Sequence, residues 1–365
     1  MKQVTKNAVA IAVQANLSVG LEGEPGIGKT AFFHALGKQL DLPVIALYGS
    51  CRSPEDIGGY PLADPVKGMI SLVPAGKWQR DLLDAGKGIL FIDELTSNNG
   101  GMQAAMMALI HERRSGDIIF PPEVVRVAAW NPADIAAGGF DLAGPLANRL
   151  IHIDWRADTE TVIEGFTDQW QDKPVPTLPP GWKDGIKAAS AFVGSFLRRY
   201  PELVHDFPKD EAKRSEPWPS PRTWYEFVVP ALAACDAAKA GEDVLAILIS
   251  GAVGNGAAMT FLTWRRELDL PDPEMLLKDP KKFVIADRHD KVFATLSSVV
   301  VAATGNLTPD RWTNAWKILH TVAQAGHVAL AATACRSLAR ARTAKMPNVS
   351  EYLKPFNPLL EAAGL

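Results

Sequence analysis

The stretch from Leu21 to Leu40, LEGEPGIGKTAFFHALGKQL, determines how the rest of the chain is interpreted. Residues 23–30 fit the pattern G-x-x-x-x-G-K-[ST] in full. The pattern follows an apolar run typical of a strand and precedes a run typical of a helix, which is the context that phosphate binding requires. Gly23, Gly26 and Gly28 let the loop turn tightly and aim its N–H groups inward, and the positive end of the following helix faces the phosphates. The sequence therefore predicts a site for a nucleoside triphosphate.

Two side chains of this loop have predicted chemical roles. Lys29 supplies a positive charge to the β- and γ-phosphates, and the hydroxyl of Thr30 is a ligand for Mg²⁺. We expect ATP and Mg²⁺ as cofactors, although the phosphate machinery does not read the base and GTP stays an alternative. The residues predicted to bind the nucleotide are Gly23, Glu24, Pro25, Gly26, Ile27, Gly28, Lys29, Thr30 and Ala31.

The composition is that of an ordinary globular protein. The chain has 365 residues, of which 47% are hydrophobic and 22% charged, and its length predicts roughly two domains. The formal net charge of −3 provides no overall basic field for nucleic acid. The three cysteines, Cys51, Cys235 and Cys335, are too scattered for a disulfide framework or a zinc module, so we expect a cytoplasmic protein. No apolar run is convincing as a transmembrane segment, so we also expect no membrane span.

Apolar runs alternate with helical patterns in the first part of the chain. A short helix is expected over residues 6–14, and the phosphate loop leads into a second helix. Strands are expected at LSVGLEG, VIALYG, GILFIDE, VVRVAAWNP and RLIHIDW. Strands that are apolar on both faces and alternate with helices indicate a parallel sheet covered on both sides, hence an α/β fold.

The pattern changes after Trp155. Pro-rich connectors cover residues 172–182 and 208–222, and helices rich in Ala and Leu are expected over 184–200, 223–240, 243–267 and within 283–342. We therefore predict a nucleotide-binding core at 1–155, a helical lid at 156–265 and a helical C-terminal extension at 266–365.

Asp93 and Glu94 end the buried strand GILFIDE. Ligands of open α/β folds bind at the carboxyl edge of the sheet, so both carboxylates are expected beside the phosphate loop. Asp93 would hold Mg²⁺, usually through water, and Glu94 would orient and polarise the attacking water. Asn131 ends the next strand, where its amide could position that water against the γ-phosphate. An Asn-Pro turn explains Asn131 as well, but its order along the chain favours the role.

Two arginines complete the predicted catalytic set. Arg149 lies just before the fifth strand and could reach the γ-phosphate of a neighbouring subunit in trans. Arg222 opens a helix of the predicted lid, from which it could contact the phosphates in cis. The rivals of Arg149 are Arg113, Arg114 and Arg156.

Taken in order, these motifs resemble those of AAA+ ATPases, and more narrowly of the MoxR-like branch. The phosphate loop, LFIDEL, AAWNP, PLANRL and SPR match the family's Walker A, Walker B, sensor 1, arginine finger and sensor 2. The similarity covers roughly residues 1–265. It departs from the family in AAWNP, where a string like ATQNP is common, in a short hairpin before sensor 1, and in a long C-terminal tail.

Two further segments resemble hairpins of this branch. Residues 53–78 look like the insert in helix 2, with two extended runs around a turn at Lys67 and Gly68. Residues 111–124 look like the hairpin before sensor 1. In related proteins these hairpins face the central pore or a partner, so the candidate contact residues are Tyr60, Leu62, Met69 and Phe120. The alternative is that these side chains pack within their own hairpins.

The resemblance implies a ring, commonly a hexamer, because a finger supplied in trans needs a neighbour. MoxR-like proteins commonly remodel or activate a protein client, often with a partner that carries a von Willebrand factor A domain. We expect that function here, with ATP hydrolysis as its energy source.

Three alternatives remain. The same clade includes nucleic-acid motors such as RuvB and the MCM helicases, but the acidic net charge makes nucleic acid an unlikely partner. The stretch with Arg336, Arg340 and Lys345 could supply a basic helical face, and a solvated surface explains it equally. A GTPase like McrB is the second alternative. A switch that no longer hydrolyses is the third, although every catalytic position looks intact.

Overall fold

The chain forms two compact units. A computed structural model describes residues 2–66, 68–74, 76–136, 139–168, 170 and 173–364, so Lys67 of the predicted hairpin turn lies outside the described residues. The first unit comprises Met1–Trp182 and Val204–Met259, and the second comprises Lys183–Leu203 and Thr260–Leu365. Each is described by itself. These units cut across the division into core, lid and extension, which stays a prediction.

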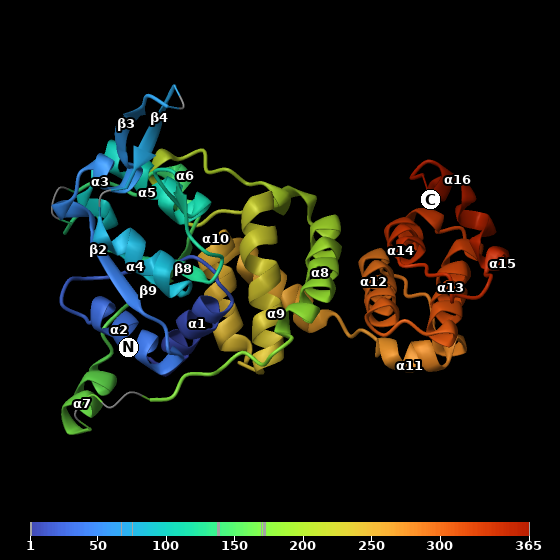
Figure 1. The fold of residues 1–365 in the computed structure, drawn as a ribbon. Helices are drawn as coiled ribbons and strands as arrows, with labels where there is room; N and C mark the ends of the chain where they lie inside the picture. The colour runs from blue at the N-terminus through green and yellow to red at the C-terminus, as the bar shows by residue number, and fades with distance from the viewer. Residues whose placement is uncertain are drawn as a thin grey trace. The chain divides into compact units, whose positions relative to one another are not determined.

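The first unit is built on a five-stranded parallel sheet with the strand order β2-β5-β8-β1-β9. Figure 1 labels its strands β2, β8 and β9. The order is not that of the sequence, so helical crossovers connect the strands on both faces. The phosphate loop follows β1, which lies between β8 and β9. The α/β fold class predicted from the sequence is confirmed. The strands are β1 Val19–Glu22, β2 Val44–Tyr48, β5 Gly88–Asp93, β8 Val124–Trp130 and β9 Ile151–Asp154.

Both faces of this sheet are covered, as the apolar runs predict. The side chains of β5 alternate between the faces: Phe91 packs on Phe33 of the helix after the phosphate loop, with ring centroids 4.8 Å apart. Leu90 and Ile92 lie in a separate buried cluster with Met106 on the other face. The helices of this unit are α1 Gln3–Gln14, α2 Lys29–Leu40, α3 Pro54–Gly58, α4 Lys77–Ala85, α5 Gly100–Glu112, α6 Gly144–Ala147, α7 Thr159–Thr167 and α9 Val229–Ala238.

The expectation that VIALYG is a buried strand is wrong in one respect. The segment is a strand, but β2 is the edge of the sheet and pairs with β5 on one side. Of its five residues only Leu47 is buried, and Tyr48 is 42% exposed. An apolar run alone does not distinguish an edge strand from a central one.

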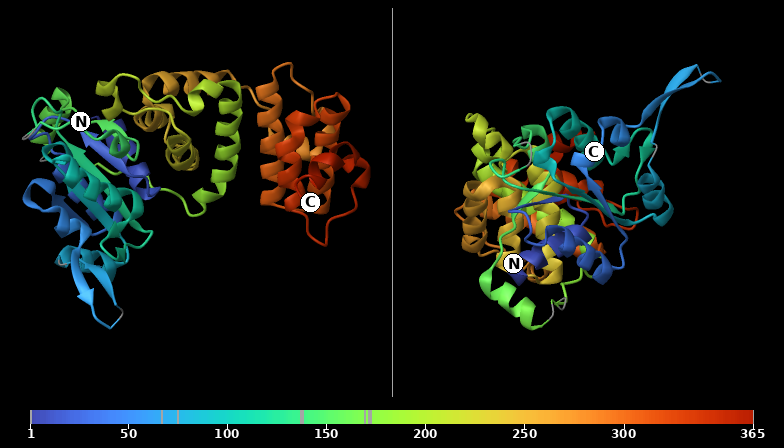
Figure 2. Two further views of the ribbon diagram at one scale, coloured as in Figure 1. Left: turned by 90° about the horizontal axis from the view of Figure 1, so that it is seen from above. Right: turned by 90° about the vertical axis from the view of Figure 1, so that its left-hand side faces the viewer.

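Both predicted hairpins are present. β3 Tyr60–Asp64 pairs antiparallel with β4 Met69–Val73, and β6 Arg114–Ser115 pairs with β7 Ile118–Ile119. The β3–β4 hairpin extends away from the sheet (Figure 2). The two hairpins are joined at Leu72, whose backbone N–H donates to Asp117 Oδ2 and whose carbonyl accepts from the Asp117 N–H, both at 2.9 Å.

Helix α10, Glu242–Glu267, begins in the first unit and ends in the second. Within the described part of the chain it is the one helix with the length and composition to cross a membrane, but 56% of its apolar window is buried in the protein. The helix is also interrupted at Gly254, where φ is 79° and ψ is 159°, a conformation open almost only to glycine. These features are those of a broken core helix.

The second unit is all helical within its described residues. Trp312 and Trp316 stand at the centre of its core, both almost completely buried. Trp264 at the end of α10 donates a 2.8 Å hydrogen bond to Asp290, and the ion pair with Arg288 contributes to a pKa of about 2 for this carboxyl group. The helices of this unit, besides the end of α10, are α8 Ile186–Arg199, α11 Pro273–Lys278, α12 His289–Gly305, α13 Pro309–Gln324, α14 Val328–Arg340, α15 Ser350–Leu353 and α16 Asn357–Glu361.

The close approach of α10 to β9 gives a test of the packing. A Cβ atom on Gly251 would lie 2.1 Å from the carbonyl oxygen of His152, so Gly251→Ala should destabilise the protein by roughly 1–3 kcal/mol. Gly256 lies on the same helix with open space around it, so Gly256→Ala should leave stability unchanged or raise it slightly. Urea unfolding of both variants measures this difference, and equal effects would contradict the described packing.

Candidate nucleotide-binding site

The carboxyl edge of the parallel sheet brings the predicted site residues together. The phosphate loop begins where β1 ends, Asp93 and Glu94 stand at the end of β5, and Asn131 follows β8. Because these three strands are parallel, their ends meet at the same edge. Residues far apart in sequence therefore lie within direct contact of the loop.

Lys29 is the first residue of α2 and only 7% exposed. Its ammonium group donates hydrogen bonds to the carbonyl of Gly23, to the carbonyl of Glu24 at 2.9 Å and to Asn131 Oδ1 at 2.8 Å. Burial lowers the pKa of Lys29, opposed by the negative charges of Asp93 and Glu22. The three described partners are neutral, so a buried cation stands in the loop without an anion in direct contact.

Thr30 and Asp93 form the second contact of the site. The hydroxyl of Thr30 donates to Asp93 Oδ2 at 2.9 Å, and the other carboxylate oxygen accepts the backbone N–H of Glu94. Burial raises the pKa of Asp93, while the hydrogen bonds from Thr30 and Glu94 lower it. A hydroxyl and a carboxylate at this spacing fit Mg²⁺, which takes one or two protein oxygens and completes its shell with phosphates and waters. No group of three or more His, Cys, Asp or Glu that could hold a metal occurs among the described residues.

Glu94 has a left-handed backbone conformation, with φ at 61°. For a residue other than glycine this costs about 1 kcal/mol, and such residues cluster at functional sites. Its carboxylate accepts a hydrogen bond from the hydroxyl of Ser50, and its carbonyl accepts one from Asn98 Nδ2 at 2.6 Å. Ser50 therefore holds the carboxylate from the loop after β2, and Asn98 holds the turned backbone.

Asn131 connects the two halves of the site. Its side-chain oxygen accepts from Lys29, and its carbonyl accepts from the hydroxyl of Thr96 at 2.7 Å. The amide is thus fixed beside the ammonium group that the phosphates would approach.

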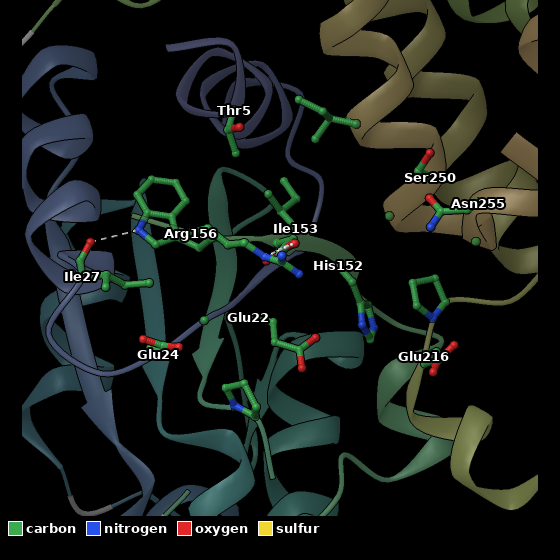
Figure 3. Close-up of a pocket in the computed structure, with 18 of the residues that line it drawn as sticks. Thr5, Glu22, Glu24, Ile27, His152, Ile153, Arg156, Glu216, Ser250 and Asn255 are labelled. Atoms are coloured by element: carbon green, nitrogen blue, oxygen red, sulfur yellow. Dashed lines mark hydrogen bonds and ion pairs between the residues drawn. The ribbon is translucent and has the colours of Figure 1, made fainter. Parts of the chain in front are cut away.

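A cavity of about 1070 Å³ opens beside the phosphate loop (Figure 3). Gly23, Glu24 and Ile27 of the loop line it, together with the end of β9, the start of α1 and the middle of α10. Its volume suits a nucleotide, since ligand pockets measure roughly 300–1,000 Å³. A base and ribose bound in this cavity would lie next to the loop that is predicted to hold the phosphates.

Glu22 lies in the wall of this cavity, directly before the loop. Burial raises the pKa of its carboxyl group, and the nearby charges of Asp154 and Glu216 raise it further. Arg156 offsets part of this, and it pairs with Asp154 at 2.7 Å. Arg156, an alternative to Arg149 as the predicted arginine finger, therefore lines the cavity beside the phosphate loop of its own chain.

Arg149 and Arg222 lie in one cationic cluster. Burial lowers the pKa of Arg149, and the charge of Arg222 lowers it further. The same two arginines lower the pKa of His111, after burial. The Nε atom of Arg149 is buried without a hydrogen-bond partner in the described structure.

The predicted contact of Arg222 with the phosphates in cis is not tested by its described hydrogen bond. Its guanidinium donates to Asn148 Oδ1 at 3.4 Å, and Ser220 donates to the same oxygen at 3.0 Å. Asn148 directly precedes Arg149, the predicted arginine finger. The segment around Arg222 is therefore hydrogen-bonded to the residue next to that finger. The sequence motif gave no sign of this, because the partner lies more than 70 residues away.

The other arginines and the hairpin residues have the following positions. Arg114 Nε lies 3.9 Å from Glu112 Oε2, and Arg113 has a left-handed backbone at the end of α5.

Tyr60, Leu62 and Met69 are exposed, as partner contacts would be. Phe120 is wrong as a contact residue: it is 1% exposed and packs against Trp78, with ring centroids 5.8 Å apart.

Sequence reasoning missed Ser50, Asn98 and Trp155. Trp155 follows β9, and its indole N–H donates to the carbonyl of Ile27 in the phosphate loop. None of the three belongs to a recognised spacing. The one available signal was position: Trp155 ends a predicted strand, and Ser50 and Asn98 follow predicted strands, on the edge of the sheet where ligands bind.

No family model matches the sequence, and no curated protein matches it significantly. Among solved structures, the chain is similar to a candidate ATPase from Cytophaga hutchinsonii at 17% identity, with a TM-score of 0.44 over 70% of this chain and 87% of that one. It is also similar to a full-length MCM homolog from Methanopyrus kandleri at 17% identity, with a TM-score of 0.39 over 68% of this chain and 59% of that one. At this level of similarity, the assignment of the site rests on its own residues.

The contact between Ser50 and Glu94 predicts a kinetic effect. A hydrogen bond to a carboxylate holds it in place, so if Glu94 is the base that the sequence predicts, Ser50→Ala should free it and raise the basal kcat for ATP several-fold with little change in KM. The exposed neighbour Cys51 contacts Ser50 and has no described contact with Glu94, so Cys51→Ala is the matched control. Steady-state phosphate release measures both, and an unchanged or lower kcat in Ser50→Ala would contradict a restraining role.

Proposed function

We propose that this protein is a Mg·ATP-hydrolysing ATPase of the AAA+ kind that works as a ring, commonly a hexamer, and remodels a protein client. One observation carries the ATPase part: the buried ammonium of Lys29 belongs to a loop that lines a nucleotide-sized cavity through Gly23, Glu24 and Ile27, and its described hydrogen-bond partners are all neutral. Burying a cation without an anion is costly, and a bound triphosphate removes that cost.

The residues around Lys29 supply the other parts of the reaction. Thr30 and Asp93 would hold Mg²⁺, which would neutralise charge on the phosphate oxygens. Glu94 accepts the proton of the attacking water once its carboxylate leaves Ser50, and Asn131 orients that water by its amide. When the nucleotide binds, before this reaction, the Lys29 ammonium group exchanges its hydrogen bonds to the loop carbonyls for hydrogen bonds to phosphate oxygens.

The ring is supported by the cationic cluster of Arg149, Arg222 and His111. The charges of Glu226 and Glu112 offset part of the repulsion in this cluster, but the buried Nε of Arg149 has no described hydrogen-bond partner, so it can still donate to an anion. We assign that anion to the γ-phosphate held by the neighbouring subunit. Since Arg222 is fastened to the residue before Arg149, both arginines act in trans on this account.

The protein client is supported by the β3–β4 hairpin. Leu62, Val66, Met69 and Ile70 are all more than half exposed, an apolar surface that marks a contact site. A MoxR-like remodeller in the cytoplasm, with a von Willebrand factor A domain partner, fits this surface.

The first experiment replaces the proposed base. Glu94→Gln should bind Mg·ATP as the wild type does and hydrolyse it at least about 100-fold more slowly, because general-base catalysis is lost. Glu123→Gln makes the same change at the opposite edge of the sheet and should have no effect. Hydrolysis by Glu94→Gln at the wild-type rate would remove Glu94 from the mechanism.

The same variant tests the client. Glu94→Gln should form a nucleotide-dependent ring by light scattering and retain a protein from lysate in the presence of ATP. Retention of DNA or RNA instead would favour a nucleic-acid motor. A chain that stays monomeric with ATP would contradict the ring.

The trans assignment is tested by mixing inactive variants. Arg149→Ala and Glu94→Gln should each be inactive, and their mixture should regain activity, because an intact Glu94 then meets an intact Arg149 from the neighbour. Arg222→Ala mixed with Glu94→Gln should behave in the same way. Lys29→Ala mixed with Glu94→Gln is the control without recovery, since both changes fall in the same half-site. Failure of both arginine mixtures to recover would contradict action in trans.

A further inference from the structure

Trp155 is the residue that follows β9, and it contacts the phosphate loop at both ends. Its backbone N–H donates to the carbonyl of Glu22 at 2.7 Å, which extends the β1–β9 pairing to the start of the loop. Its own carbonyl lies so near Gly23 that a Cβ atom there would be 2.1 Å away. The indole N–H donates to the carbonyl of Ile27 at 3.3 Å, the hydrogen bond marked at Ile27 in Figure 3.

The indole itself is fixed. Trp155 is 1% exposed, and its ring packs on Phe32 of α2 with ring centroids 4.7 Å apart. A donor held in this way keeps its direction without losing further side-chain entropy on binding.

The contact with Ile27 has a consequence for the next residue. In a trans peptide the C=O and the N–H point in opposite directions, so holding the Ile27 carbonyl toward the indole aims the Gly28 N–H away from it. The structure contains no cis peptide bond among its described residues. In a phosphate loop, backbone N–H groups directed inward bind the phosphates.

The loop needs such a restraint because its glycines do not provide one. Gly26 and Gly28 both have positive φ angles, 79° and 83°, and neither would place a Cβ within 4 Å of a neighbour. Glycine at such positions makes the conformation accessible without fixing it.

We propose that Trp155 is a positioning residue for nucleotide binding: its indole N–H fixes the Ile27–Gly28 peptide so that the Gly28 N–H faces the phosphates. This inference rests on the proposed function, since it requires that the loop binds a triphosphate. The inference adds to the site a residue outside the phosphate loop. That residue sets the direction of a loop N–H group before the nucleotide binds.

The test is Trp155→Phe, which keeps an aromatic ring and removes the donor. Its Kd for Mg·ATP should rise roughly three- to tenfold, the effect of one hydrogen bond, with kcat at saturation unchanged. The matched control is Trp264→Phe in the second unit, which removes an equally buried indole donor, here bonded to Asp290, and should leave Kd at the wild-type value.

Two further measurements separate positioning from stability. A purely structural role lowers the melting temperature without nucleotide but preserves the rise that Mg·ATP produces, whereas a positioning role reduces that rise. If Trp155→Phe folds poorly, β-(3-benzothienyl)alanine at position 155 keeps the shape of the ring system and replaces the N–H by sulfur.

The outcomes are distinguishable. A raised Kd in either position-155 variant, with Trp264→Phe unchanged, supports the inference. A wild-type Kd in the benzothienyl variant overturns it while the proposed ATPase stands. Absence of Mg·ATP binding by the wild-type protein overturns both.

Discussion

The hydrogen bonds of the Lys29 ammonium group are the interaction on which the candidate site depends. They join the two ends of the site, because the carbonyls of Gly23 and Glu24 belong to the phosphate loop and Asn131 stands at the end of β8. A buried cation whose direct partners are all neutral is a costly arrangement, and on the proposed function a bound anion compensates it. The loop, the cavity and the carboxylates of Asp93 and Glu94 are placed where a Mg²⁺-bound triphosphate would complete it.

The parallel sheet makes this arrangement possible. Three strands distant in sequence end at one edge, and the residues at or after their ends supply an ammonium group, two carboxylates and an amide. The restraints come from outside the recognised motifs: Ser50 holds Glu94, and Trp155 holds the loop. The same organisation explains why each restraint follows a strand, since that is where the chain passes the site.

The sequence was informative where function demands a fixed spacing. The phosphate loop, Asp93, Glu94 and Asn131 were located correctly at one edge because glycine conformation and strand polarity restrict where such residues can stand. It was less informative where contacts are long-range. The apolar pattern does not distinguish β2 as an edge strand, and it does not show that Phe120 is buried against Trp78. The SPR motif does not show that Arg222 is hydrogen-bonded to Asn148, the residue before Arg149. The chemical roles of the site residues, as distinct from their positions, remain predictions.

The most direct measurement is a calorimetric titration of the protein with Mg·ATP, with Lys29→Ala alongside and Mg·GTP as a second ligand. The account predicts one site per chain with a Kd below about 1 mM, and a loss of at least about 100-fold in affinity in Lys29→Ala. A comparison of the two nucleotides shows which base the cavity prefers. Equal binding by the wild type and Lys29→Ala, or no binding by the wild type, would contradict the assignment of the buried ammonium group to a triphosphate site.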